Sequence, residues 1–233
     1  MNDNRIKLFD LMKEDNETAW SSLFEKEKIS DALFNYLFKN VNKFCYKQIH
    51  QIRKGIELNL NEQQLLVLAQ PQLKTFQMIQ IRLGFERGLS IEQIELLANN
   101  KFKWNQMQIV RKALESGLTE DQVKLFATTD FNANQMKQIY YCFKNNLSNE
   151  QIKVLANPVF NFSQMNHIRL AFEQGLTTEQ VELLANPEFD VNQMTYIRMG
   201  LEYGLDISQV STYAKTELSW EEMSQLLLKL KEA

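Results

Sequence analysis

Five arginines that recur at equivalent positions are the first candidates for chemistry in this 233-residue chain. A row of guanidinium groups could bind a chain of phosphates. A glutamate follows each arginine by four residues, however, within ion-pair reach on the same face of a helix. We therefore predict that the arginines pair with these glutamates and bond neighbouring repeats. The five pairs are Arg53/Glu57, Arg82/Glu86, Arg111/Glu115, Arg169/Glu173 and Arg198/Glu202, and in one repeat Tyr140 and Lys144 take their place.

Other reactive residue types are few and widely spaced. The two cysteines are Cys45 and Cys142 and the two histidines are His50 and His167, with no spacing typical of a metal site. Glycine-rich phosphate loops, nucleophile elbows and zinc-binding helix motifs do not occur. We therefore expect no catalytic residues, no metal, no cofactor and no small-molecule substrate, and a protein that is not an enzyme. Cys142 occupies a position that holds Gly or Ala in the other repeats, which predicts a small buried residue.

These residues belong to a repeat with a period of 29 residues. Slid along the chain, the stretch 160–189 recurs with a methionine at one fixed position: Met78, Met107, Met136, Met165, Met194 and Met223. A period between about 20 and 50 residues is typical of a stacked-repeat solenoid. The pattern predicts an all-α fold, an α-solenoid of tandem helix-turn-helix repeats.

Capping residues place two helices in each repeat. Asn, Asp or Ser followed three residues later by Gln or Glu predicts the start of the first helix, as at Asn161 and Gln164. About 12 residues later a Gly or Asn predicts its end through a left-handed backbone. A second capping box, such as Thr177 with Gln180, then predicts a helix of about two turns.

The repeat register divides the chain into three parts. We predict an N-terminal helical cap over 1–43, six two-helix repeats over 44–218 and a C-terminal capping helix over 219–233. The cap is expected to hold short helices over 4–14 and 17–27, with Trp20 in its core, and a third helix that begins at Ser30.

Composition indicates a folded chain, with 44% hydrophobic and 24% charged residues. No apolar run approaches the roughly 20 residues that span a bilayer, and the N-terminus lacks the apolar core of a signal peptide. We expect no membrane partner and a cytoplasmic location. The net charge of −3 conceals a basic surplus over 101–153 and an acidic surplus over 154–233.

A stripe on the first helices is the candidate protein-binding surface. We expect the positions equivalent to 138, 141 and 145 to face outward, and the last three repeats carry aromatic and methionine side chains there. Such residues are enriched at protein interfaces, although scattered exposed apolar residues need no function. The candidate residues are Tyr141, His167, Leu170, Tyr196, Met199 and Tyr203. Trp104, Phe162 and Trp220, just after the first N-cap, are expected instead to pack against the preceding loop.

The repeat unit resembles tandem repeats in proteins of mobile elements, phages and plasmids of low-GC bacteria. The residues that carry this resemblance follow the pattern QMxxIRxAFExGL(S/T)xEQVxxLANPxF over roughly 44–230. It assigns no activity. Small proteins from such elements often blunt host defence by docking on a defence protein, so the resemblance implies a protein partner, such as a CRISPR effector that an anti-CRISPR inhibits.

A second resemblance leaves nucleic-acid binding open as the alternative. The segment 176–186, LTTEQVELLAN, is similar to the first helix of the DNA-reading repeats of transcription-activator-like effectors. Those repeats read bases through a glycine-rich loop, whereas this chain has Asn-Pro or Asn-Asn there. The basic central repeats would supply the contacts in this alternative, through Lys103, Lys112, Lys137 and Lys144.

Overall fold

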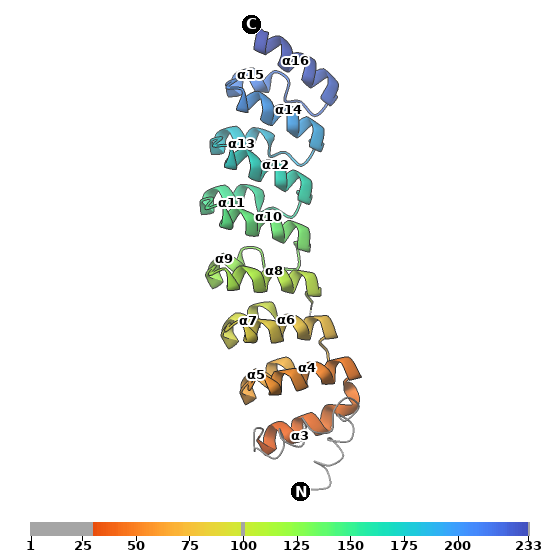
Figure 1. The fold of residues 1–233 in the computed structure, drawn as a ribbon. Helices are drawn as coiled ribbons and strands as arrows, with labels where there is room; N and C mark the ends of the chain where they lie inside the picture. Colours follow the sequence, from red (N-terminus) through yellow and green to blue (C-terminus); the bar gives the residue numbers. More distant parts are fainter. Residues whose placement is uncertain (1–29, 99–100, 233) are drawn as a thin grey trace. The chain divides into compact units, whose positions relative to one another are not determined.

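A computed structural model describes residues 30–98 and 101–232 of the chain (Figure 1). Every regular element within those ranges is a helix, and no strand occurs among them. The predicted helices over 4–14 and 17–27, and Trp20, lie outside the described residues. The chain divides into two compact units, Met1–Ala127 and Thr128–Ala233, and we describe each by itself. The division falls at the start of the repeat in which Tyr140 replaces the recurrent arginine.

The N-terminal unit is a stack of helix pairs in which the first helices α4, α6 and α8 pack successively (Figure 1). The shorter helices α5, α7 and α9 form a second row along them. Helix α3 begins after Ser30, whose side chain accepts a hydrogen bond from the N–H of Leu33 at 3.1 Å, so the predicted N-cap is confirmed. The bounds are α3 Asp31–Asn40, the 3-10 helix η1 Val41–Lys43, α4 Tyr46–Glu57, α5 Glu62–Leu68, α6 Thr75–Glu86, α7 Ile91–Leu97, α8 Trp104–Glu115 and α9 Glu120–Lys124.

The C-terminal unit repeats the same arrangement. Its first helices α10, α12, α14 and α16 pack successively, and a shorter helix follows each of the first three (Figure 1). The bounds are α10 Ala133–Lys144, α11 Asn149–Leu155, α12 Phe162–Glu173, α13 Thr178–Leu184, α14 Val191–Glu202, α15 Ile207–Ser211 and α16 Trp220–Glu232. The predicted all-α fold of stacked helix pairs is confirmed in both units.

Local capping chemistry determines where these helices begin. In α13, the hydroxyl of Thr177 accepts from the N–H of Gln180 at 3.2 Å, and the Gln180 side chain accepts from the N–H of Thr177 at 2.9 Å. The same pair of reciprocal bonds is present at the start of the second, shorter helix of each repeat, namely α5, α7, α9, α11, α13 and α15. The predicted second capping boxes are therefore confirmed.

Left-handed residues end the first helices, as predicted. Gly117 has φ +90°, and Asn146 adopts φ +59° at the equivalent place. The next residue then donates back into the last turn: the N–H of Leu118 bonds to the carbonyl of Ala113 at 3.1 Å. This geometry satisfies carbonyl groups that a helix end would otherwise leave without donors.

Small residues allow the two helices of a repeat to approach closely. A Cβ added at Gly84 would lie 2.4 Å from Ile94 of α7, and one added at Gly200 would lie 1.9 Å from the hydroxyl of Tyr213. Cys142, in the same register, is completely buried. Its predicted role as a small buried residue is confirmed, and burial raises the pKa of its thiol to about 12. Across the described residues, no helix has the length and apolar character needed to cross a membrane.

Candidate binding surfaces

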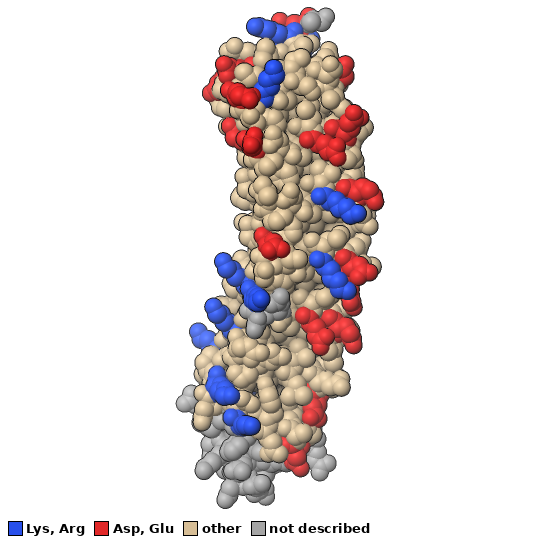
Figure 2. Space-filling model, turned by 180° about the vertical axis from the view of Figure 1, so that it is seen from behind, with Lys and Arg blue, Asp and Glu red and all other residues tan. Residues whose placement is uncertain are grey.

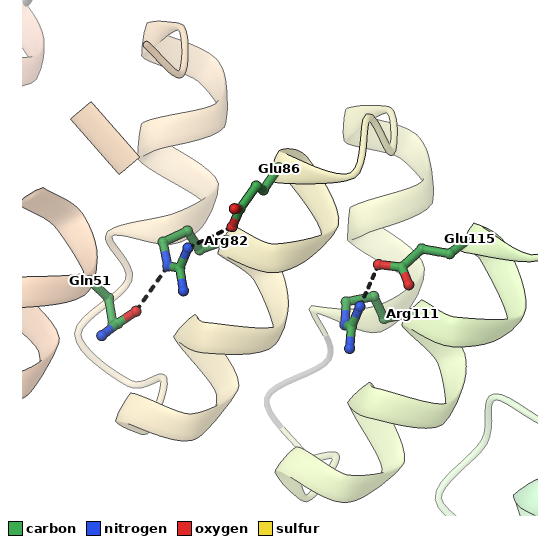
Figure 3. A network of polar contacts seen from close by, with 5 residues as sticks. All are labelled: Gln51, Arg82, Glu86, Arg111 and Glu115. Atoms are coloured by element: carbon green, nitrogen blue, oxygen red, sulfur yellow. Dashed lines mark hydrogen bonds and ion pairs between the residues drawn. The ribbon is translucent and has the colours of Figure 1, made fainter. Parts of the chain in front are cut away.

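The arginine row is structural, as its spacing predicts. Figure 3 shows that Arg82 and Arg111 each reach along their own helix to a glutamate four residues further on. The Arg82–Glu86 and Arg53–Glu57 distances are both 2.8 Å. Arg169 and Arg198 make the same contact with Glu173 and Glu202 in the C-terminal unit. All five guanidinium groups are largely covered, so they do not form an open phosphate-binding track.

The same arginines join neighbouring first helices through buried glutamines. Nε of Arg82 donates to Oε1 of Gln51 at 3.0 Å (Figure 3). The equivalent distances are 3.0 Å for Arg111 to Gln80 and 3.1 Å for Arg169 to Gln138. This result corrects one expectation. The first position of the stripe does not face outward in four repeats, because Gln51, Gln80, Ile109 and Gln138 are buried between helices.

A second glutamine joins repeats in five of the first helices, in a way that sequence reasoning missed. The side-chain oxygen of Gln164 accepts from the N–H of Asn161 at 2.9 Å, as a capping box requires. Its amide nitrogen also donates to the carbonyl of Phe189, 25 residues further on in the next repeat, at 2.9 Å. Equivalent bonds run from Gln48 to Leu73, Gln77 to Phe102, Gln135 to Phe160 and Gln193 to Leu218. The signal was present in the sequence, because these residues are Gln in every one of those repeats.

One column of candidate residues is apolar throughout the C-terminal unit. Tyr141, Leu170 and Met199 hold the same position on α10, α12 and α14, and each is half-buried. The 29-residue register adds Leu228 of α16, which is 55% exposed. We define these four residues as the apolar column. Leu228 was missed because the closing helix was treated only as a cap, although the period places it in this row.

The remaining candidates flank the apolar column and are partly engaged. Tyr203 is 52% exposed, with the ammonium group of Lys231 3.6 Å from its ring centroid. The half-buried Tyr196 stacks on Trp220, with ring centroids 5.9 Å apart. His167 is also half-buried, and its Nδ1 is buried without a hydrogen-bond partner. Burial, and then the neighbouring positive charge of Arg198, lower the pKa of His167.

The rings just after the first N-caps are more open than expected. Trp104 is 45% exposed, Phe162 49% and Trp220 38%. The rings recorded next to Trp104 and Trp220 belong to Phe76 and Tyr196, on the first helices of the preceding repeats. Trp104 and Trp220 therefore pack against rings of the preceding first helices, and all three side chains remain partly exposed.

The four lysines of the nucleic-acid alternative are divided between the two units. Lys103 precedes α8 and Lys112 lies in its last turn, which separates them by about 13 Å along the axis at 1.5 Å per residue. Lys137 and Lys144 belong to α10 in the other unit, where the Lys137 ammonium group lies 5.4 Å from the Tyr141 ring centroid. Lys112 borders an open hollow with Arg87, Arg111 and Glu115. Arg111 is already bonded to Glu115 there.

Within 30–98 and 101–232, no group of three His, Cys, Asp or Glu side chains is placed to hold a metal ion. Comparison with known proteins adds no further candidate, because no family model, curated protein or solved structure matches the chain.

Proposed function

We propose that this chain is a non-enzymatic binding protein and that its C-terminal unit recognises another protein. The apolar column carries the proposal. Four successive first helices present an apolar side chain at a position where the N-terminal unit holds Lys54, Leu83 and Lys112. Aromatic and methionine side chains are enriched in the buried centres of protein interfaces.

The residue types in the apolar column can change without loss of the hydrogen bonds that join the repeats. The hydrogen bonds between repeats come from other positions, those of Gln164, Gln138 and Arg169. The side chains at the column positions therefore need not be apolar for the helices to pack. Tyr203, which is exposed, and the half-buried Tyr196 extend the surface along α14, and Tyr and Met side chains next to one another favour a protein partner over a small ligand.

A capture experiment with matched variants tests the proposal. Immobilised full-length protein is incubated with bacterial lysate, and retained proteins are identified by mass spectrometry. The column variant combines Leu170→Ser, Met199→Ser and Leu228→Ser. The control is Val159→Ser, which changes an apolar residue that is 65% exposed in a loop of the same unit. We expect the column variant to lose a partner that wild type and control retain, with unchanged helicity by circular dichroism. Equal retention by all three proteins would refute the proposal.

The resemblance to repeat proteins of mobile elements directs the first choice of partner. We propose a bacterial defence protein, with CRISPR effectors as the first class to assay. The direct measurement is inhibition of target-DNA cleavage by a purified effector, with and without the column variant. An effector that cleaves equally fast with and without the wild-type protein would exclude that effector as a partner.

A further inference from the structure

The loop edges of the two units carry opposite charge. In each repeat we take nine residues that cover the loop and the first turn of the next first helix. In the N-terminal unit these segments are 40–48, 69–77 and 98–106, and they hold five lysines and no acidic residue: Lys43, Lys47, Lys74, Lys101 and Lys103. The four equivalent segments of the C-terminal unit, 127–135, 156–164, 185–193 and 214–222, hold one lysine and six acidic residues.

Exposed aromatic rings alternate with these lysines. Tyr46 is 48% exposed, Phe76 61% and Trp104 45%, and they lie in the first turns of α4, α6 and α8. All five lysines are exposed as well. We call these five lysines and three rings the basic edge. Figure 2 shows basic side chains gathered along one edge of the N-terminal unit.

Contacts between neighbouring repeats bring these residues into one row. Sγ of Cys45, which precedes α4, lies 3.8 Å from the hydroxyl of Thr75 at the start of α6. The ring centroids of Phe76 on α6 and Trp104 on α8 are 5.8 Å apart. The starts of the three first helices are therefore side by side, and their charges and rings form a single surface.

The helix starts of this edge also differ from those of the other unit. Cys45, Lys74 and Lys103 hold the N-cap positions of α4, α6 and α8, and no side-chain cap hydrogen bond forms there. In the C-terminal unit, Asn161 and Asp190 accept from the first N–H groups of α12 and α14.

We propose that the basic edge binds single-stranded nucleic acid. A single strand supplies phosphates at close intervals for the lysines and open base faces for the rings. Duplex nucleic acid also offers phosphates to the lysines, but its bases are stacked inside the helix and cannot stack on the three exposed rings. A base can stack on the outer face of the Phe76–Trp104 pair while its flanking phosphates reach Lys74 and Lys103. The proposal concerns the N-terminal unit and is independent of the apolar column.

Fluorescence anisotropy with a 5′-labelled 20-nucleotide oligo-dT tests this proposal on the full-length protein. We expect binding that weakens with salt, with a slope of log affinity against log salt of about −3 for four or five phosphate contacts. Lys74→Glu with Lys103→Glu should weaken binding at least about tenfold. It should also make the slope of log affinity against log salt less steep, by about 1.4. The matched control is Lys54→Glu with Lys124→Glu, which makes the same charge change elsewhere on the same unit and should bind as wild type.

The rings are tested separately from the charges. Phe76→Ser with Trp104→Ser should weaken oligo-dT binding roughly 5- to 150-fold for each base whose stacking is lost, with an unchanged salt slope. Heparin and a 20-base-pair duplex serve as competitors that offer charge without open bases, and we expect both to compete poorly at equal charge concentration. An unchanged melting temperature verifies that each variant folds.

A dye on Cys45 locates the bound strand. Cys45 is exposed and Cys142 is buried, so a thiol-reactive fluorophore should label one site per folded chain. Addition of oligo-dT should change the emission of this dye, because Tyr46 and Lys47 are adjacent to it. Absence of oligo-dT binding at 50 mM salt overturns the proposal. The proposal is also overturned if heparin competes as well as oligo-dT and the Phe76→Ser, Trp104→Ser variant binds as wild type. Preferential binding to anionic phosphatidylglycerol vesicles, or equal weakening of oligo-dT binding by the control variant, would overturn it as well.

Discussion

Replacement of Gln164 by leucine measures what the hydrogen bonds between repeats contribute to stability. The Gln164 side chain is 5% exposed and bonds to three backbone groups. Its oxygen accepts from the N–H of Asn161 at 2.9 Å, and its nitrogen donates to the carbonyls of Phe189 and Pro187, both at 2.9 Å. Leucine preserves the volume and makes none of these bonds.

The expected loss follows from the burial of each group. The bond to the Phe189 carbonyl is buried, and a buried acceptor left without a donor costs about 1–3 kcal/mol. The Asn161 N–H and the Pro187 carbonyl are only part-buried, so that water can replace the glutamine, and together they add about 1 kcal/mol. We therefore expect Gln164→Leu to lower the free energy of unfolding by about 2–4 kcal/mol.

Gln180→Leu is the matched control. Gln180 makes the same capping-box bond to its own helix start at Thr177, and no bond from it to another repeat is recorded. Its replacement should cost only about 0.5–1 kcal/mol, the usual value of a cap. Guanidinium unfolding followed at 222 nm gives the free energies. Hydrogen exchange, which reports each repeat separately, should show the loss centred on α12 and α14, because repeat arrays are stabilised by nearest-neighbour interfaces. If Gln164→Leu costs no more than Gln180→Leu, the proposed contribution of the inter-repeat bond is refuted.

Three further predictions concern the packing, the helix ends and the histidine of α12. Gly200→Ala should lose about 1–3 kcal/mol because its Cβ would lie 1.9 Å from the Tyr213 hydroxyl, and Tyr213→Phe in the same chain should recover part of that loss in a double-mutant cycle. Gly117→Val should lower stability by at least about 1 kcal/mol through its φ of +90°, whereas Gly117→Asn should be tolerated; equal melting temperatures for both would contradict a backbone origin. His167→Gln should add about 1 kcal/mol by offering an acceptor to the buried, unpartnered Nε of Arg198. The pKa of His167 is lowered in the folded state, so folding becomes less favourable when the pH falls below the unfolded pKa of about 6.5. Urea titrations at pH 5 and pH 8 should show this loss of stability in the wild type and not in His167→Gln.

Local chemistry made much of the fold predictable. The spacing of Thr177 and Gln180 determines a helix start through bonds that span only three residues. The stop at Gly117 follows from the conformational freedom of glycine, and the pairing of Arg169 with Glu173 from the geometry of one helical turn. Each of these features depends on neighbours within one helix or one turn, so each could be read without knowledge of how repeats pack.

Features that depend on contacts between repeats were harder to predict. Gln138 and Gln164 carry a side chain that suits solvent as well as a buried hydrogen bond, so their residue type does not indicate which face of the helix packs. Trp104 and Phe162 were expected to pack against the preceding loop, yet their place in the first turn leaves them 45% and 49% exposed. The row of lysines at the starts of α4, α6 and α8 is spread over some 60 residues of sequence, and only the stacking of the repeats brings it together.

The C-terminal unit departs from its own stacking rule at one place, next to the apolar column. Position 138 and its equivalents supply a glutamine to the arginine of the next repeat, but His167 and Tyr196 hold that position in the last two repeats. At His167 both its Nδ1 and the Nε of Arg198 are buried without a hydrogen-bond partner, which costs stability that a glutamine would restore. Local departures of this kind are expected where a surface serves recognition rather than stability. The departure lies next to Leu170 and Met199. It therefore points to the same part of the molecule as the apolar column does for the binding site.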